Sequence, residues 1–167
     1  MKLNQEEIRQ KLTDWMVNFV EQSNPMLGSW APCPYARQAR INNKIEIKFC
    51  EVADFNTVIK SSTEDLTTKD VVVVCFDHND IGPEALQEWI TDVNKSMLLP
   101  QDYVILEDHP NSPEYINGVN MNFGACGLLV IQRLSKLTDA ADQLRSKGYY
   151  DHWNDQELNS VVTWRTQ

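Results

Sequence analysis

The chain has 167 residues, with 24 acidic and 15 basic side chains that give a formal net charge of −9. This length suits one domain with a real core and is short for two, so we expect a single globular domain over residues 1–167. The negative charge argues against nucleic acid or an anionic membrane surface as a partner, because either requires a clustered basic face. The lack of a long apolar stretch and of an apolar leader predicts a cytoplasmic protein that does not associate with membranes.

The four cysteines, at positions 33, 50, 75 and 126, are far apart, and none forms a Cys-x2-Cys pair. That spacing does not suit a structural zinc site. It also lacks the paired pattern of a disulfide framework and is typical of free thiols in a reducing compartment. We therefore expect no resident cofactor.

The first half of the chain predicts two helices around one strand. Asn4 and Glu7 have the spacing of a helix start, and apolar residues then recur at helical intervals as far as Val20. Residues 44–49 alternate apolar and charged side chains, which indicates a strand with one buried face. Asp54 then begins a second helix.

In the second half, residues 71–76 form a continuous apolar run, which favours a central strand covered on both faces. A helix is expected from Gly82-Pro83 to Pro100, followed by strands at 103–106 and 128–131 and a helix over 138–147. The order α-β-α-β-α-β-β-α predicts an α/β (α+β) sandwich around a mixed four-stranded sheet, with a ferredoxin-like variant as the alternative.

Cys33 lies between two prolines, directly before a short cationic run. Pro34 suits the first helical position, which would place Cys33 at the N-cap, where free N–H groups and the helix dipole favour a thiolate. Arg37 and Arg40 follow at spacings that share one side of the helix, so they are candidates to bind an anionic substrate group. The Cys-x3-Arg spacing differs from the Cys-x5-Arg loop of phosphatases, and we exclude that class. The alternative is a cysteine that only packs in a turn.

Two polar loops follow predicted strands, at residues 77–80 and 107–110. If both strands are parallel, their carboxyl ends meet where open α/β sheets bind ligands. The candidate residues are Asp77, His78, Asp108 and His109, joined by Asn120 and Asn122 from the long segment 109–125. The alternative interpretation is that the aspartates and asparagines are turn formers and that His109 is a turn histidine. A metal held by the two histidines and neighbouring aspartates ranks below both interpretations.

Two short elements resemble an uncharacterised domain family of bacteria and plants. The family has Cys-Pro-Phe-Ala near its start, and later a His-Pro followed by an Asn-rich segment and an apolar strand. The matching positions here are Cys33-Pro34-Tyr35-Ala36, His109-Pro110, Asn120 and Asn122. Where the family has an Arg-Ser-Pro step, this chain has Phe123-Gly124-Ala125. The resemblance implies a site but no reaction.

Two functions follow as hypotheses. In the first, the protein is a small-molecule enzyme: Cys33 is the nucleophile or redox thiol, His109 the acid or base, and Asp108 or Asp77 orients the histidine. Arg37 and an asparagine of the long loop would bind the substrate. In the second, the protein is an acidic adaptor that binds a basic protein or peptide, and Cys33 has no chemical role.

Overall fold

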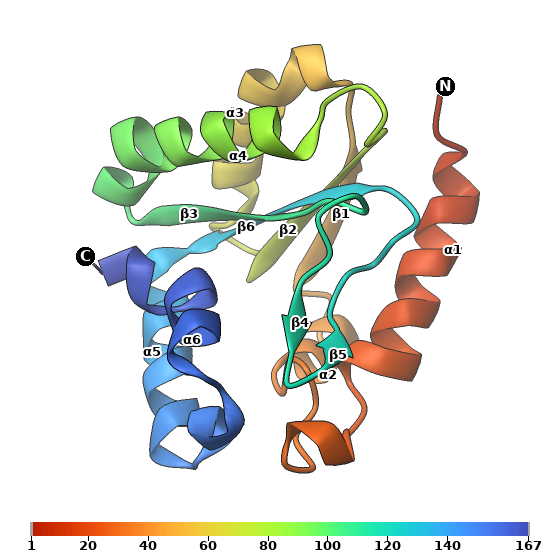
Figure 1. Ribbon diagram of the computed structural model, residues 1–167. Coiled ribbons are helices and arrows are strands. Elements are labelled where there is room, and N and C mark those ends of the chain that lie inside the picture. Colours follow the sequence, from red (N-terminus) through yellow and green to blue (C-terminus); the bar gives the residue numbers. More distant parts are fainter. Residues whose placement is uncertain (1, 167) are drawn as a thin grey trace.

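The continuous apolar run of the sequence lies inside the sheet of the computed structural model, which describes residues 2–166 (Figure 1). The sheet has the strand order β1-β2-β6-β3; β1 and β2 are parallel, and β6 is antiparallel to both of its neighbours. A separate two-stranded sheet joins β4 to β5. The strands are β1 (Ile45–Phe49), β2 (Val71–Phe76), β3 (Tyr103–Asp108), β4 (Tyr115–Ile116), β5 (Val119–Asn120) and β6 (Gly127–Arg133).

This architecture confirms the predicted α+β fold with a mixed four-stranded sheet. The ferredoxin-like alternative is wrong, because that motif has the order β-α-β-β-α-β, whereas here a helix follows each of the first two strands of the main sheet. The helices are α1 (Gln5–Trp15), α2 (Ala36–Ile41), α3 (Phe55–Asp65), α4 (Pro83–Val93), α5 (Leu134–Ser146) and α6 (Asp155–Val161).

The two faces of the sheet are covered by different helices. In Figure 1, α3 and α4 lie on one side, and α1 lies on the other side near β1. Alternation along β2 explains the two layers: Val72, Val74 and Phe76 pack into the core beneath α3 and α4, while Val73 and Cys75 pack against α1. β2 is therefore buried on both faces, which accounts for its lack of polar alternation.

Local capping sets the start of α1. The Asn4 side chain accepts a hydrogen bond from the Glu7 N–H at 3.3 Å, as the spacing of the two residues predicts. α5 begins at Leu134, four residues before the expected start at Thr138. Among the described residues no helix combines the length and the apolar character needed to cross a membrane.

The segment between β3 and β6 forms a small hairpin of β4 and β5, where the sequence indicated a long irregular loop. Asn117, at the tip of the hairpin, connects two distant parts of the chain. Its side-chain amide donates to the Met26 carbonyl at 2.6 Å, and its backbone N–H donates to the Glu157 carboxylate at 3.0 Å. The hairpin is thereby fixed against both the N-terminal and the C-terminal regions.

Candidate functional site

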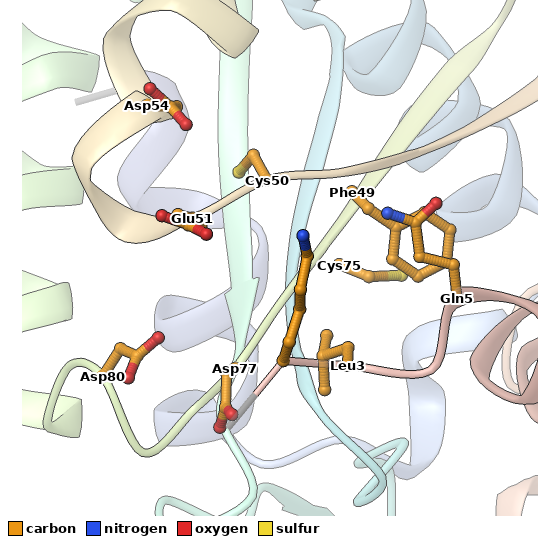
Figure 2. Close-up of a pocket in the computed structure, with 10 residues that line it drawn as sticks. Leu3, Gln5, Phe49, Cys50, Glu51, Asp54, Cys75, Asp77 and Asp80 are labelled. Carbon is orange, nitrogen blue, oxygen red and sulfur yellow. The ribbon is translucent and has the colours of Figure 1, made fainter.

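A cavity of about 520 Å³ opens at the carboxyl ends of β1 and β2 (Figure 2). Because these two strands are adjacent and parallel, the residues that follow them reach the same edge of the sheet. The lining residues come from the start of the chain, the end of β1 with the turn that follows it, and the end of β2 with its following loop. They are Lys2, Leu3, Gln5, Phe49, Cys50, Glu51, Asp54, Cys75, Asp77 and Asp80.

Carboxylates dominate this lining. Four of the ten residues are acidic (Glu51, Asp54, Asp77 and Asp80) and one, Lys2, is basic. Figure 2 shows the four carboxyl groups spread around the cavity rather than converging on one point. Consistent with this spread, no three metal-ligating side chains within residues 2–166 are grouped so that they could hold a metal ion.

Asp77 is held in its ionised form. It is 7% exposed, and its Oδ1 accepts hydrogen bonds from the Asn79 backbone N–H at 3.0 Å and from the Asn79 side-chain amide at 2.9 Å. The backbone bond is the main cause that lowers the pKa of Asp77 below its ordinary value. A negative charge is therefore fixed at the end of β2.

The other three carboxylates, on Glu51, Asp54 and Asp80, are exposed, and none has a salt-bridge partner within the described chain. One of these carboxylates acts on a neighbouring thiol. Burial is the main cause that raises the pKa of Cys50 to about 11, and the charge of Asp54 adds to it. The cavity is thus a region of negative potential with a neutral thiol in its wall.

The remaining walls are apolar. Leu3, Phe49 and Cys75 line the cavity between the polar groups. Cys75 is fully buried, and a hydrogen bond with Cys126, together with burial, raises the pKa of its thiol far above the ordinary value. Neither Cys50 nor Cys75 is a thiolate near neutral pH, so neither is suited to act as a nucleophile. The cavity therefore has the character of a binding site.

Cys33 lies in a turn before α2, three residues ahead of the first helical residue, Ala36. The expectation that Cys33 is the N-cap is wrong, because Tyr35 occupies that position. The residue is exposed to solvent, yet the surrounding protein desolvates its thiolate and raises its pKa. Backbone N–H groups of Tyr35 and Ala36 oppose this effect, as the dipole argument anticipated, while the charge of Glu21 reinforces it. Desolvation thus opposes the easy ionisation of Cys33 that the sequence predicts, and a reactive Cys33 stays a prediction.

The two arginines proposed to bind substrate have different surroundings. Arg40 pairs with Glu21 through two bonds, Nε to Oε1 at 2.6 Å and Nη2 to Oε2 at 3.0 Å, and the Glu21 side chain is 2% exposed. Arg40 thus neutralises a buried carboxylate of its own chain. Arg37 is exposed on α2.

His109 is buried, with 2% exposure, and both of its ring nitrogens have backbone partners. Nδ1 accepts from the Asn111 N–H at 3.1 Å, so the proton is on Nε2, which lies 2.9 Å from the Ile81 carbonyl. The His78 ring contacts the His109 ring edge to face, at 5.8 Å between centroids, and the Nδ1 atom of His78 is buried without a partner in the described part of the chain. This geometry gives His109 a structural role in joining two loops.

Asp108 and the asparagines of the hairpin form one hydrogen-bonded network. The Asn122 amide donates to Asp108 at 3.2 Å and to the His109 carbonyl at 3.1 Å, while the Asn122 N–H donates to the Asn120 side chain at 2.9 Å. The Phe123 N–H donates to the other Asp108 oxygen at 3.0 Å. The side chains of Asp108, Asn120 and Asn122 thus bind groups of their own segment, as expected if these residues are turn formers rather than substrate-binding residues.

Cys33 and His109 have no contact residue in common among those recorded in the described part of the chain. The groups that act on Cys33 come from residues 21, 35 and 36, whereas His109 contacts residues 78, 81 and 111. Of the candidates, Asp77 alone lines the 520 Å³ cavity. The catalytic roles of Cys33, His109 and Asp108 stay predictions. Glu51 and Asp54 were missed, although they follow the first strand just as Asp77 follows the second.

In the comparisons with known proteins, no family model, no curated protein and no solved structure matches this chain.

Proposed function

We propose that the protein binds a small organic cation, with an amine or guanidinium group, in the cavity at the carboxyl ends of β1 and β2. The observation that carries this proposal is the set of three carboxylates, Glu51, Asp54 and Asp80, that have no salt-bridge partner within residues 2–166 and surround one cavity that also contains ionised Asp77. Among the described lining residues the four acidic groups outnumber the one cation, Lys2, so negative charge is in excess around this space, and a bound cation reduces the repulsion between the carboxylates.

The size and walls of the cavity suit an organic ligand. Its volume of about 520 Å³ is within the range of roughly 300–1,000 Å³ typical of small-molecule sites. Leu3 and Phe49 offer apolar surface for the methylene groups of a ligand, and the carboxylates accept charge-assisted hydrogen bonds from its cationic end. The side chain of lysine or arginine has the same chemistry, so the basic peptide of the adaptor hypothesis would also present a suitable group here.

Calorimetry with a matched pair of ligands tests the proposal. Agmatine carries an amine and a guanidinium on a four-carbon chain, and 1,4-butanediol is a neutral compound with the same chain. We expect agmatine to bind and the diol not to bind. The Glu51→Gln, Asp80→Asn double variant should bind agmatine at least about tenfold more weakly, because it loses two charged acceptors.

The control is the Glu88→Gln, Asp92→Asn double variant, which removes the same charge from exposed positions of α4 outside the cavity. It should keep the native affinity. Equal weakening in both double variants would show only a general effect of net charge and would overturn the site, as would equal binding of the diol.

A further inference from the structure

A second cavity, of about 170 Å³, lies between α5 and the C-terminal segment after α6. These elements are the blue part of the chain in Figure 1, on the opposite side of the molecule from α1. The lining consists of Thr138, Ala141, Asp142 and Arg145 from α5 and Val162, Thr163 and Arg165 from the C-terminal segment. Two arginines thus face one small space.

Arg165 is the most informative of these residues. It is 6% exposed, its Nε donates to the Val162 carbonyl at 3.1 Å, and its Nη1 is buried without a hydrogen-bond partner among the described residues. No carboxylate within residues 2–166 pairs with it. Arginine stays protonated in proteins, and a buried charge is costly unless an opposite charge accompanies it. Because residues 2–166 supply no counter-charge, the buried guanidinium of Arg165 is suited to an anionic ligand.

Arg145 adds a second cation at the same cavity. Its Nη1 lies 3.6 Å from the Asp142 carboxylate, with 56% and 64% of the two side chains exposed, so this pair is weak and screened by solvent. The charges of Arg165 and Arg145 both act on Tyr150, where they lower a pKa that burial raises. The two guanidinium groups therefore produce a shared positive field, of which Asp142 offsets only part.

We propose that this cavity binds a small oxyanion, either inorganic phosphate or the phosphate group of a metabolite, between Arg165 and Arg145. Guanidinium groups present donors in a fork that matches the oxygens of phosphate, and the Thr138 hydroxyl supplies a further donor. A water molecule takes up about 30 Å³ in the liquid, so the cavity has room for a tetrahedral oxyanion. The site is separate from the acidic cavity and has the opposite charge preference.

Thermal unfolding and calorimetry test the site with inorganic phosphate and with glycerol 3-phosphate, each compared with NaCl at the same ionic strength. A ligand that binds the folded state raises its stability. Phosphate also stabilises proteins generally by exclusion from their surfaces, so the result has to be read as a difference between variants. We expect Arg145→Gln to lower phosphate affinity about tenfold and Lys147→Gln, an exposed neighbour outside the cavity, to leave it unchanged.

Arg165→Met separates binding from folding. Without phosphate, this variant should unfold at the native temperature or above it, because replacing a buried charge by an apolar side chain of similar length removes a desolvation penalty. In phosphate it should lack the additional rise that the native protein shows. A preference for glycerol 3-phosphate over inorganic phosphate would identify a metabolite as the source of the group, and the reverse preference the free ion.

Two results would overturn the proposal. One is an equal rise of the unfolding temperature in phosphate for the native protein, Arg145→Gln and Arg165→Met. The other is the absence of calorimetric binding of both inorganic phosphate and glycerol 3-phosphate by the native protein at millimolar concentration. If Arg165→Met does not fold, the comparison of Arg145→Gln with Lys147→Gln still decides the matter, because both changes are at exposed positions of the α5 region.

Discussion

Asn94 binds the backbone of Ile105 through both ends of its side-chain amide. Nδ2 donates to the Ile105 carbonyl at 2.9 Å, and Oδ1 accepts from the Ile105 N–H at 2.9 Å. β3 is an edge strand of the sheet, so these two backbone groups have no neighbouring strand on that side. Asn94 is 2% exposed, so water does not reach these groups freely. The side-chain amide thus pairs with the backbone of the edge strand as a neighbouring strand would.

Replacing Asn94 by leucine should lower the free energy of unfolding by about 2–6 kcal/mol, because two buried backbone groups lose their partners at about 1–3 kcal/mol each. Urea unfolding followed by circular dichroism measures this loss. Lys95→Leu, an exposed change in the same turn, should alter stability by less than about 0.5 kcal/mol. A loss below about 1 kcal/mol for Asn94→Leu would show that water replaces the amide.

The same contact illustrates what the sequence cannot show. The run of apolar residues in β2 and the helical spacing of apolar residues in α4 are local patterns. They predicted these elements because the apolar residues of each pattern are the ones that the folded protein buries. Asn94 looks like one more polar position near the end of a helical pattern. Its role depends on a strand that begins nine residues later, and no pattern within the helix encodes that partner.

The candidate site divides in the same way. The sequence marked Asp77 as a site candidate because the strand before it is visibly central, but it paired the end of that strand with the end of the strand at 103–106. In the sheet β6 lies between β2 and β3, and the parallel neighbour whose end meets that of β2 is β1. A common site for Cys33 and His109 depended on how two irregular segments 76 positions apart in the chain would fold relative to the sheet. The contacts that decide this, from Tyr35 and Ala36 at Cys33 and from Ile81 and Asn111 at His109, are mostly made by backbone atoms, which the sequence does not display.

Asp108 should make stability depend on pH between about 4 and 6. Burial raises its pKa to about 6 from an ordinary value of 3.8, although Phe123 and Asn122 donate hydrogen bonds to it. Between these values the folded state binds more protons than the unfolded state, so this group's contribution to stability is full below pH 4 and is lost as the pH rises through 6. A difference of about two pKa units corresponds to about 3 kcal/mol.

The measurement is the free energy of urea unfolding at pH 4 and pH 7, for the native protein and for Asp108→Asn. Asparagine keeps an oxygen for the Phe123 N–H but does not titrate in this range. Because other carboxylates such as Asp77 titrate with the opposite sign, the informative quantity is the difference between the two proteins. The variant should gain stability relative to the native protein on going from pH 4 to pH 7; identical pH profiles would contradict the assignment.

Asn122 should control the local stability of the hairpin. Its amide holds Asp108 and the His109 carbonyl, and its Oδ1 accepts from the Glu114 N–H at 2.6 Å. In Asn122→Ala, limited proteolysis within residues 110–121 should be about tenfold faster, which corresponds to about 1.4 kcal/mol of local opening. Asn111→Ala removes an exposed amide from the same segment and is the matched control. Equal cleavage of both variants would assign the order of the segment to β4 and β5 alone.

Cys33 provides the sharpest test of the enzyme hypothesis. Its pKa is raised above the ordinary 9.0, so the native thiol should react with iodoacetamide at pH 7 more slowly than free cysteine, and the rate should rise through pH 9 and above. Labelling sites can be assigned by mass spectrometry, with Cys33→Ser to subtract the reaction of half-buried Cys50.

The charge of Glu21 raises the pKa of Cys33, so Glu21→Gln should increase the rate at pH 7. A midpoint below pH 8 in the native protein would mean that the backbone N–H groups of Tyr35 and Ala36 outweigh desolvation. Cys33 would then regain its place as a candidate nucleophile. A midpoint above pH 9 leaves the position with too little thiolate for catalysis at neutral pH and favours the alternative that Cys33 has no chemical role.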